Sequence, residues 1–150
     1  MSSALKALVI VLVALAVLAI AAVGIGMWWW SKHGLALQTQ AKTARAEGSA
    51  FGRDTDERGC LAEALRRVEG DSGFRAGIAA SMFVTACLET GATSEGFCDE
   101  VPPTSEILTG GGWRAARCRE AGLDATVCGT ILKQVQSHCD ARRATPVALS

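Results

Sequence analysis

The chain has 150 residues, and its 15 lysines and arginines balance its 15 aspartates and glutamates, so the formal net charge is zero. This balance gives no indication of the basic surface typical of nucleic-acid binding, and we therefore expect no nucleic-acid partner. The chain has no tyrosine, and alanine, arginine, glutamate and glycine are abundant. This composition favours an all-α fold over a β-sheet.

The stretch from Ala7 to Trp30 carries no charge and ends in three consecutive tryptophans. A helix of this length measures about 36 Å, enough to cross the ~30 Å hydrocarbon core of a bilayer with some tilt. We therefore predict a transmembrane anchor over 7–30, preceded by an N-terminal tail over 1–6. Because tryptophan is enriched at membrane–water interfaces, the residues expected at the interface are Trp28, Trp29, Trp30 and Lys32.

A cleavable signal peptide is the alternative for this segment. Lys6 would form its basic region, and Ala19-Ile20-Ala21 has the small-x-small pattern of a cleavage site. The apolar region of a signal peptide is shorter, however, and here the uncharged stretch continues past Ala21 to the tryptophans. The pattern therefore favours an uncleaved anchor with the lipid bilayer as a partner.

Small residues recur along one line of the predicted anchor, at Ala7, Ala14 and Ala21. Such a line permits two membrane helices to approach closely, which makes a homodimer a candidate arrangement. In a span so rich in alanine, the same repeat also arises by chance.

Residues 31–52 are expected to connect the anchor to the rest of the chain. Good helix formers with few large apolar residues indicate a solvated helical stalk or a loose linker. The segment Gly48-Ser49-Ala50-Phe51-Gly52 is expected to end it.

The segment 53–143 is predicted to form a small, disulfide-stapled helical bundle of about four to five helices. Its first helix begins with a capping box, in which Asp54 is followed three residues later by Glu57. Ser72 can cap a second helix that runs to Thr90.

Prolines and glycines divide the second half of this segment. The Pro-Pro pair at 102–103 is expected to end a short third helix, and the glycines at 110–112 to form a flexible loop before a helix that starts near Trp113. The final helix is expected over 124–143, and residues 144–150 are expected to form a flexible tail.

All six cysteines follow the predicted anchor, and an even number in a small domain indicates three disulfides in an oxidising compartment. The charges that flank the anchor favour the opposite orientation, because Lys32, Lys42 and Arg45 outnumber Lys6. We give more weight to the cysteines. The expected location is the inner (plasma) membrane, with a cytoplasmic N-terminus and a periplasmic or extracellular C-terminal domain.

Two corners of the chain share a pattern, at 87–98 and 118–128. In each, a glycine that would end a helix lies four residues after a cysteine, and a capping residue, Ser94 or Asp124, restarts a helix with a second cysteine inside it. Cys128 and Cys139 lie about 16 Å apart on one helix and cannot pair with each other. The predicted disulfides are therefore Cys87–Cys98, Cys118–Cys128 and Cys60–Cys139.

Little in the sequence indicates catalysis. No Cys-x-x-Cys motif is present, and the neighbours His138 and Cys139 would point about 100° apart on a helix, which argues against a shared metal ion. We expect no catalytic residue, no cofactor and no metal. The expected function is a non-enzymatic binding or scaffolding module of a bacterial-type cell envelope assembly, with an unidentified envelope protein as partner.

Two alternatives stay open. One is a thiol-based redox enzyme or sensor that uses one labile cysteine pair. The other is a phage-type inner-membrane lysis accessory, because inner-membrane spanins have similar length and topology, although this chain lacks their long coiled coil.

Overall fold

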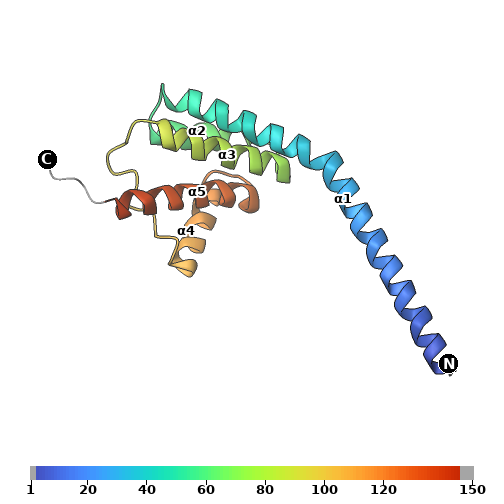
Figure 1. Cartoon of the computed structure of the whole chain (residues 1–150). Coiled ribbons are helices and arrows are strands. Elements are labelled where there is room, and N and C mark those ends of the chain that lie inside the picture. The colour runs from blue at the N-terminus through green and yellow to red at the C-terminus, as the bar shows by residue number, and fades with distance from the viewer. Residues whose placement is uncertain (1–2, 146–150) are drawn as a thin grey trace. The chain divides into compact units, whose positions relative to one another are not determined.

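The computed structural model describes residues 3–145, without the side chains of residues 3–5, 30 and 32–35. Over this range the chain forms five α-helices and no strand, which confirms the all-α prediction for this part of the chain (Figure 1). The helices are α1 (Ser3–Gly52), α2 (Glu57–Arg66), α3 (Phe74–Thr90), α4 (Ile107–Glu120) and α5 (Ala125–Ala144).

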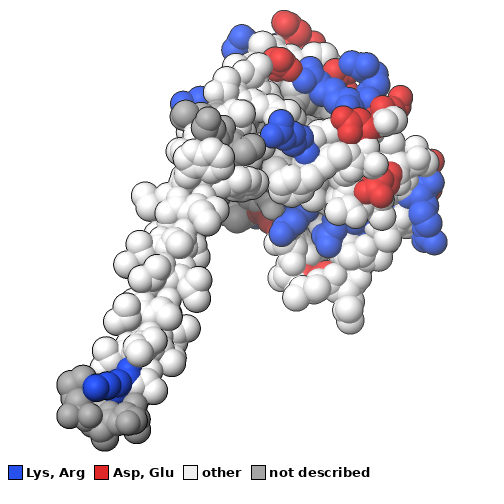
Figure 2. All heavy atoms as spheres, turned by 90° about the vertical axis from the view of Figure 1, so that its right-hand side faces the viewer, with Lys and Arg blue, Asp and Glu red and all other residues white. Residues whose placement is uncertain are grey.

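The chain divides into two units, Met1–Thr39 and Gln40–Ser150, and we describe each by itself. In the first unit, the stretch Lys6–Trp29 has a mean hydropathy of 3.2 and none of it is buried. Figure 2 shows this helix without charged side chains along most of its visible surface. By length and composition this helix can cross a membrane, and a signal sequence has the same properties.

The residues predicted for the membrane interface and for a dimer contact lie in this first unit. Trp28 and Trp29 are 62% and 56% exposed, and Ala7, Ala14 and Ala21 are exposed as well. The side chains of Trp30 and Lys32 lie outside the described residues, as does the part of the predicted tail from 146 to 150.

The second unit begins earlier than expected, because the last turns of α1 pack on α3. Helix α1 ends at Gly52, the last residue of the segment predicted to end it, and Gly48 does not break it. A Cβ atom at Gly48 would collide with the carbonyl oxygen of Phe83, and one at Gly52 would lie 2.6 Å from the carbonyl oxygen of Cys87. These glycines therefore serve the close approach of α1 to α3, and Ala44, one turn earlier, is buried on the same face.

The buried ring of Phe83 lies at the centre of this contact. The ring of Phe51 packs against it with 5.7 Å between centroids, and the guanidinium of Arg67 lies 3.8 Å from its centroid. Arg67 also donates to Glu47 at 2.6 Å. The last turns of α1 therefore belong to the helical unit and not to a solvated linker, so this unit starts at Gln40 and not at residue 53.

Helix α2 starts two residues later than the expected capping box. Asp56 is its N-cap, and its carboxylate accepts from the amide of Gly59 at 2.9 Å. Asp54 instead belongs to the turn that ends α1, where its amide donates to the Phe51 carbonyl. Thus the turn out of α1 displaces the predicted cap.

Two further predictions about local structure are wrong. Residues 94–101 form turns and no α-helix. Ser94 is buried and does not act as a cap, because its hydroxyl accepts from the Arg58 amide at 3.4 Å and its amide donates to the Glu57 carboxylate at 2.8 Å. The glycines at 110–112 lie inside α4 and do not form a loop. Gly110 is buried against α5, where an added Cβ would meet the Gln136 amide nitrogen at 2.7 Å.

Helices α3 and α5 pack along each other and supply most of the core, and α2 packs on both of them. Helix α4 packs on α5 and runs across it, away from the other helices (Figure 1). Among the described residues, α2 and α4 make no backbone approach to each other. The buried apolar side chains of the two central helices are Ala80, Phe83, Val84, Ala86, Cys87, Leu88, Val127, Cys128, Ile131, Leu132, Val135 and Cys139.

The six cysteines pair as Cys60–Cys87, Cys98–Cys139 and Cys118–Cys128, with Cα–Cα distances of 5.6, 5.4 and 5.8 Å. The predicted pairs Cys87–Cys98 and Cys60–Cys139 differ from this result. The predicted pair Cys118–Cys128 agrees with it.

The two corners differ because their glycines adopt different conformations. Gly122 has φ +67°, the left-handed conformation that reverses a helix end, and the chain turns back so that Cys118 meets Cys128. Gly91 is extended instead. The next residue, Ala92, exchanges two backbone hydrogen bonds of 3.0 Å with the start of α2. This pairing of Ala92 with the start of α2 places Cys60 next to Cys87 and directs the chain so that Cys98 lies away from Cys87.

Candidate functional site

A groove of about 800 Å³ lies between α2 and α4. It exists because both helices pack on α5 and not on each other. Its apolar side chains are Leu61 and Leu65 from α2, Phe97 from the turn segment, Trp113 from α4 and Leu132 from α5. Charged side chains at its edges are Arg58, Asp99, Glu100, Arg117 and Glu120.

Helix α2 supplies two apolar rows, only one of which is fully buried. Cys60 and Ala64 are fully buried against the core. Leu61 and Leu65 lie on the adjacent face and stay partly exposed. The helix therefore carries more apolar surface than the unit itself buries, and the excess lines the groove.

Trp113 forms part of the opposite wall. Its indole Nε1 is buried and has no hydrogen-bond partner among the described residues. An unpaired buried donor of this kind costs about 1–3 kcal/mol. The residue also lines a second hollow of about 410 Å³ beside Val101, Pro102 and Pro103, so the indole lies where the two hollows meet.

The groove lining carries three carboxylates, on Asp99, Glu100 and Glu120, against two guanidinium groups, on Arg58 and Arg117. Arg117 lies between two carboxylates, 3.0 Å from Glu100 and 3.6 Å from Glu120. Asp99 is exposed, and no partner of its carboxylate occurs among the described residues. Arg58 donates to the backbone carbonyl of Glu95 at 2.9 Å.

A second cluster of polar groups surrounds the buried carboxylate of Glu57, which is 1% exposed. Its oxygens accept from the amide of Ser94 at 2.8 Å and from Arg142 Nη1 at 2.7 and 2.8 Å. His138 Nε2 lies 2.7 Å from the same carboxylate. Burial alone would raise the pKa of Glu57, but the Ser94 amide, His138 and Arg142 together lower it below the ordinary value.

Both carboxylate oxygens of Glu57 are bonded within this cluster. Every bond described above uses the two carboxylate oxygens of Glu57, so neither oxygen is available to a substrate. Among the described residues, no group of three histidine, cysteine, aspartate or glutamate side chains could hold a metal ion. Sequence reasoning placed Glu57 in a capping box and missed the cluster, because its partners lie far away in the sequence.

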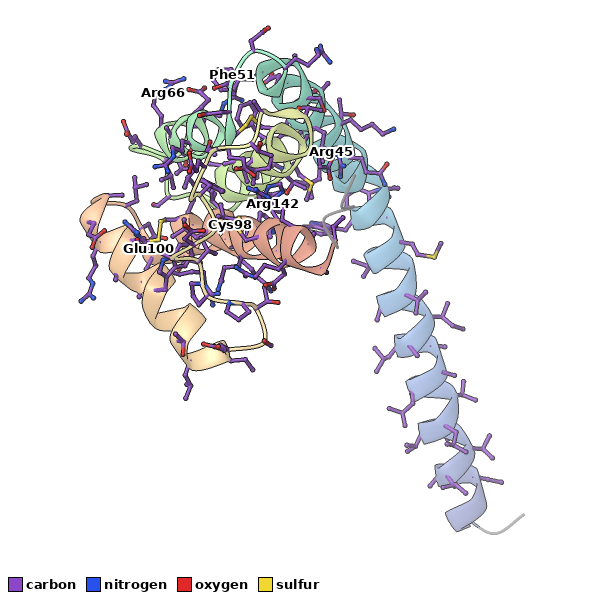
Figure 3. All side chains as sticks on the ribbon, turned by 90° about the vertical axis from the view of Figure 1, so that its left-hand side faces the viewer. Arg45, Phe51, Arg66, Cys98, Glu100 and Arg142 are labelled. Atoms are coloured by element: carbon purple, nitrogen blue, oxygen red, sulfur yellow. A yellow bond between two sulfur atoms is a disulfide. The ribbon has the colours of Figure 1, made fainter. Side chains whose placement is uncertain are left out.

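The disulfide Cys98–Cys139 borders the Glu57 cluster. Five of the six cysteines are fully buried, and Cys98 alone is partly exposed. The guanidinium of Arg142 lies 3.9 Å from the Cys98 sulfur (Figure 3). Of the three bridges, this one is therefore the most accessible to an external thiol.

The groove and the Glu57 cluster were both absent from the sequence-based expectations. The sequence shows Leu61 and Leu65 at helical spacing, but it does not show that they stay partly exposed between α2 and α4. Comparison with known protein families, curated proteins and solved structures finds no match to this chain.

Proposed function

We propose that this chain is a membrane-anchored, non-enzymatic binding module of a bacterial-type cell envelope, and that the groove between α2 and α4 binds a partner protein. The observation that carries the proposal is the partly exposed apolar surface of the groove, formed by two helices that pack on a third. Grooves of this kind between helices bind apolar side chains of a partner.

The disulfides support the binding role. Three cross-links tie α2 to α3, the turn segment to α5, and α4 to α5. A rigid groove loses little conformational entropy when a partner binds, which favours affinity. The chemistry of the groove supports a non-enzymatic role, because its carboxylates and guanidinium groups lie at exposed edges.

The proposed location rests on two properties of the chain. The stretch Lys6–Trp29 has the length and hydropathy of a membrane span. Stable disulfides need an oxidising compartment, which in an inner-membrane protein means the periplasmic or extracellular side. A reporter fused after Ser150 should be active only if it functions in the periplasm. The intact mass of the membrane-bound chain should include the residues before Ala21. A mass that begins after Ala21 would show a cleaved signal sequence.

Site-specific photo-crosslinking tests the binding role. A photoreactive amino acid at exposed Ala62, which lines the groove, should form an adduct with a partner protein in native membranes. The same group at Lys133, an exposed α5 residue outside the groove lining, is the matched control. The adduct from Ala62 should disappear when Leu61→Glu places a charge in the groove. Equal adducts from both positions would contradict the proposal.

A second candidate function is thiol–disulfide exchange at Cys98–Cys139. The partial exposure of Cys98 and the nearby guanidinium of Arg142 favour it, since a cation stabilises a thiolate. Titration of the native chain with a glutathione redox buffer distinguishes the two functions. A structural bridge resists the glutathione pool, whereas a redox-active one opens within the range of that buffer.

A further inference from the structure

We infer that the groove between α2 and α4 binds a positively charged amphipathic helix of the partner protein. This inference rests on the proposed function and specifies the chemistry of the partner. Three properties of the groove carry it: its walls, its charges and the position of Trp113.

The walls suit a helix. Helix α2 forms one wall and α4 the other, while Leu132 of α5 and Phe97 of the turn segment add apolar surface between them. A helix that enters this space completes the packing that α2 and α4 do not make with each other. Its apolar side chains, repeated every three to four residues, would cover Leu61 and Leu65, which lie one turn apart.

The charges select the sign of the partner. The groove lining carries three carboxylates, on Asp99, Glu100 and Glu120, and two guanidinium groups, on Arg58 and Arg117, so its net charge is negative. Arg117 is shared between two of the carboxylates, and Arg58 donates to a backbone carbonyl. Asp99 has no partner of its own among the described residues. Lysines or arginines beside the apolar face of the bound helix would meet these carboxylates. Exposed pairs add little affinity, but they set specificity and the rate of association.

Trp113 lies where an anchor residue of such an interface is expected. Tryptophan is enriched among the residues that dominate binding energy. Its indole nitrogen has no hydrogen-bond partner among the described residues, and its side chain lines both hollows. No hydrogen bond therefore fixes the position of the indole. We therefore expect the environment of Trp113 to change when the helix binds.

The test uses the full chain in nanodiscs of zwitterionic lipid. Replacing Trp28, Trp29 and Trp30 by phenylalanine leaves Trp113 as the single tryptophan of the chain, because the sequence contains four. The probes are two synthetic helices of about 18 residues with one leucine face, flanked by lysines in one peptide and by glutamates in the other. The change in Trp113 fluorescence is measured against peptide concentration.

The lysine peptide should bind about tenfold more tightly than the glutamate peptide, as two or three exposed ion pairs would produce. The double variant Asp99→Lys, Glu120→Lys should remove or reverse this preference. Leu61→Glu should weaken both peptides, and Ala62→Arg at an exposed position supplies a second groove variant that keeps the core intact.

Each outcome separates the charge inference from the proposed function. Equal affinity for the two peptides, or tighter binding of the glutamate peptide, overturns the inference while the groove stays a binding site. If the affinity for the lysine peptide is unchanged in all groove variants, the peptide binds elsewhere on the chain, and this result also overturns the inference. An adduct between two copies of this chain at Ala62 overturns it in favour of self-association. Failure of both peptides, together with no groove-specific adduct at Ala62, overturns the proposed function itself.

Discussion

Glu57 at the start of α2 and Arg142 near the end of α5 form an ion pair in which the carboxylate is almost fully buried, with both oxygens within 2.8 Å of one guanidinium nitrogen. His138, one turn before Arg142, approaches the same carboxylate, and the Ser94 amide adds a bond from the turn segment. One side chain therefore joins three parts of the helical unit.

Replacing Glu57 by glutamine should lower the free energy of unfolding by about 2–3 kcal/mol. The amide leaves Arg142 without its counter-ion and keeps only one acceptor oxygen. The value stays below that of a fully buried pair because Arg142 is partly exposed. Urea unfolding followed by circular dichroism measures the change.

Glu63→Gln is the matched control for this substitution. Glu63 pairs with Arg66 and Arg67 on the surface of α2, and exposed pairs contribute about 0–1 kcal/mol each. Equal losses for the two variants would show that the buried carboxylate has no special role in stability.

The stability of the helical unit should fall in acid. The Thr104 hydroxyl, with Arg143 and the Thr104 amide, lowers the pKa of Asp140 to about 2 from the ordinary value of 3.8. A lowered pKa contributes stability that is present above pH 3.8 and is lost as the pH falls through about 2. The pKa of Glu57 is lowered too, so its contribution is lost in the same direction.

Unfolding measured between pH 5 and pH 2 checks this dependence. The slope of the free energy of unfolding against pH should decrease in Asp140→Asn, because the substituted side chain no longer titrates. The exposed Glu95, replaced by glutamine, serves as the control. An unchanged slope in Asp140→Asn would contradict the assignment.

Two glycine-to-alanine substitutions should have opposite effects. Gly48→Ala places a methyl group against the Phe83 carbonyl and should cost about 1–3 kcal/mol, because the backbone of α3 must move. Gly111→Ala on α4 meets no atom within 4 Å and should stabilise the unit by about 0.5–1 kcal/mol through helix propensity. Thermal unfolding of the two variants measures both. Stabilisation by Gly48→Ala would mean that α1 does not pack closely on α3.

Peptide mapping without reduction should recover the linked pairs Cys60–Cys87, Cys98–Cys139 and Cys118–Cys128. Under a mild reductant, the Cys98–Cys139 bridge should open first, because Cys98 alone among the six is not fully buried. Alkylation of newly freed thiols followed by mass spectrometry gives the order. Prior opening of Cys118–Cys128 would contradict the accessibility argument.

Some features of the fold can be predicted from the sequence because they depend on local chemistry. Asp124 caps α5 with bonds of 3.0 and 3.1 Å to the amides of Thr126 and Val127, as its position before an apolar run indicates. The long uncharged helix near the N-terminus depends only on composition. The all-α class follows from the same kind of pattern.

Other features depend on contacts between distant segments. Gly48 and Gly110 look like helix breakers in sequence, but each allows a close approach to another helix that the sequence does not display. Gly91 and Gly122 occupy equivalent positions in the two corners, yet only Gly122 adopts the left-handed conformation. The disulfide partner of Cys87 depends on this difference between Gly91 and Gly122. The groove depends on the packing of α4 on α5, so neither feature could be predicted from the sequence.

The three disulfides divide the helical unit into two covalently closed rings. One ring runs from Cys60 to Cys87, and the other runs from Cys98 to Cys139 with the Cys118–Cys128 link nested inside it. Only the segment 88–97 joins the rings. A single peptide cleavage inside either ring would leave the fragments linked under non-reducing conditions. One cleavage after the exposed Glu95 would instead leave two polypeptides held together by non-covalent contacts alone: the packing of α3 and α2 on α5, and the bonds of Glu57 to Arg142 and His138.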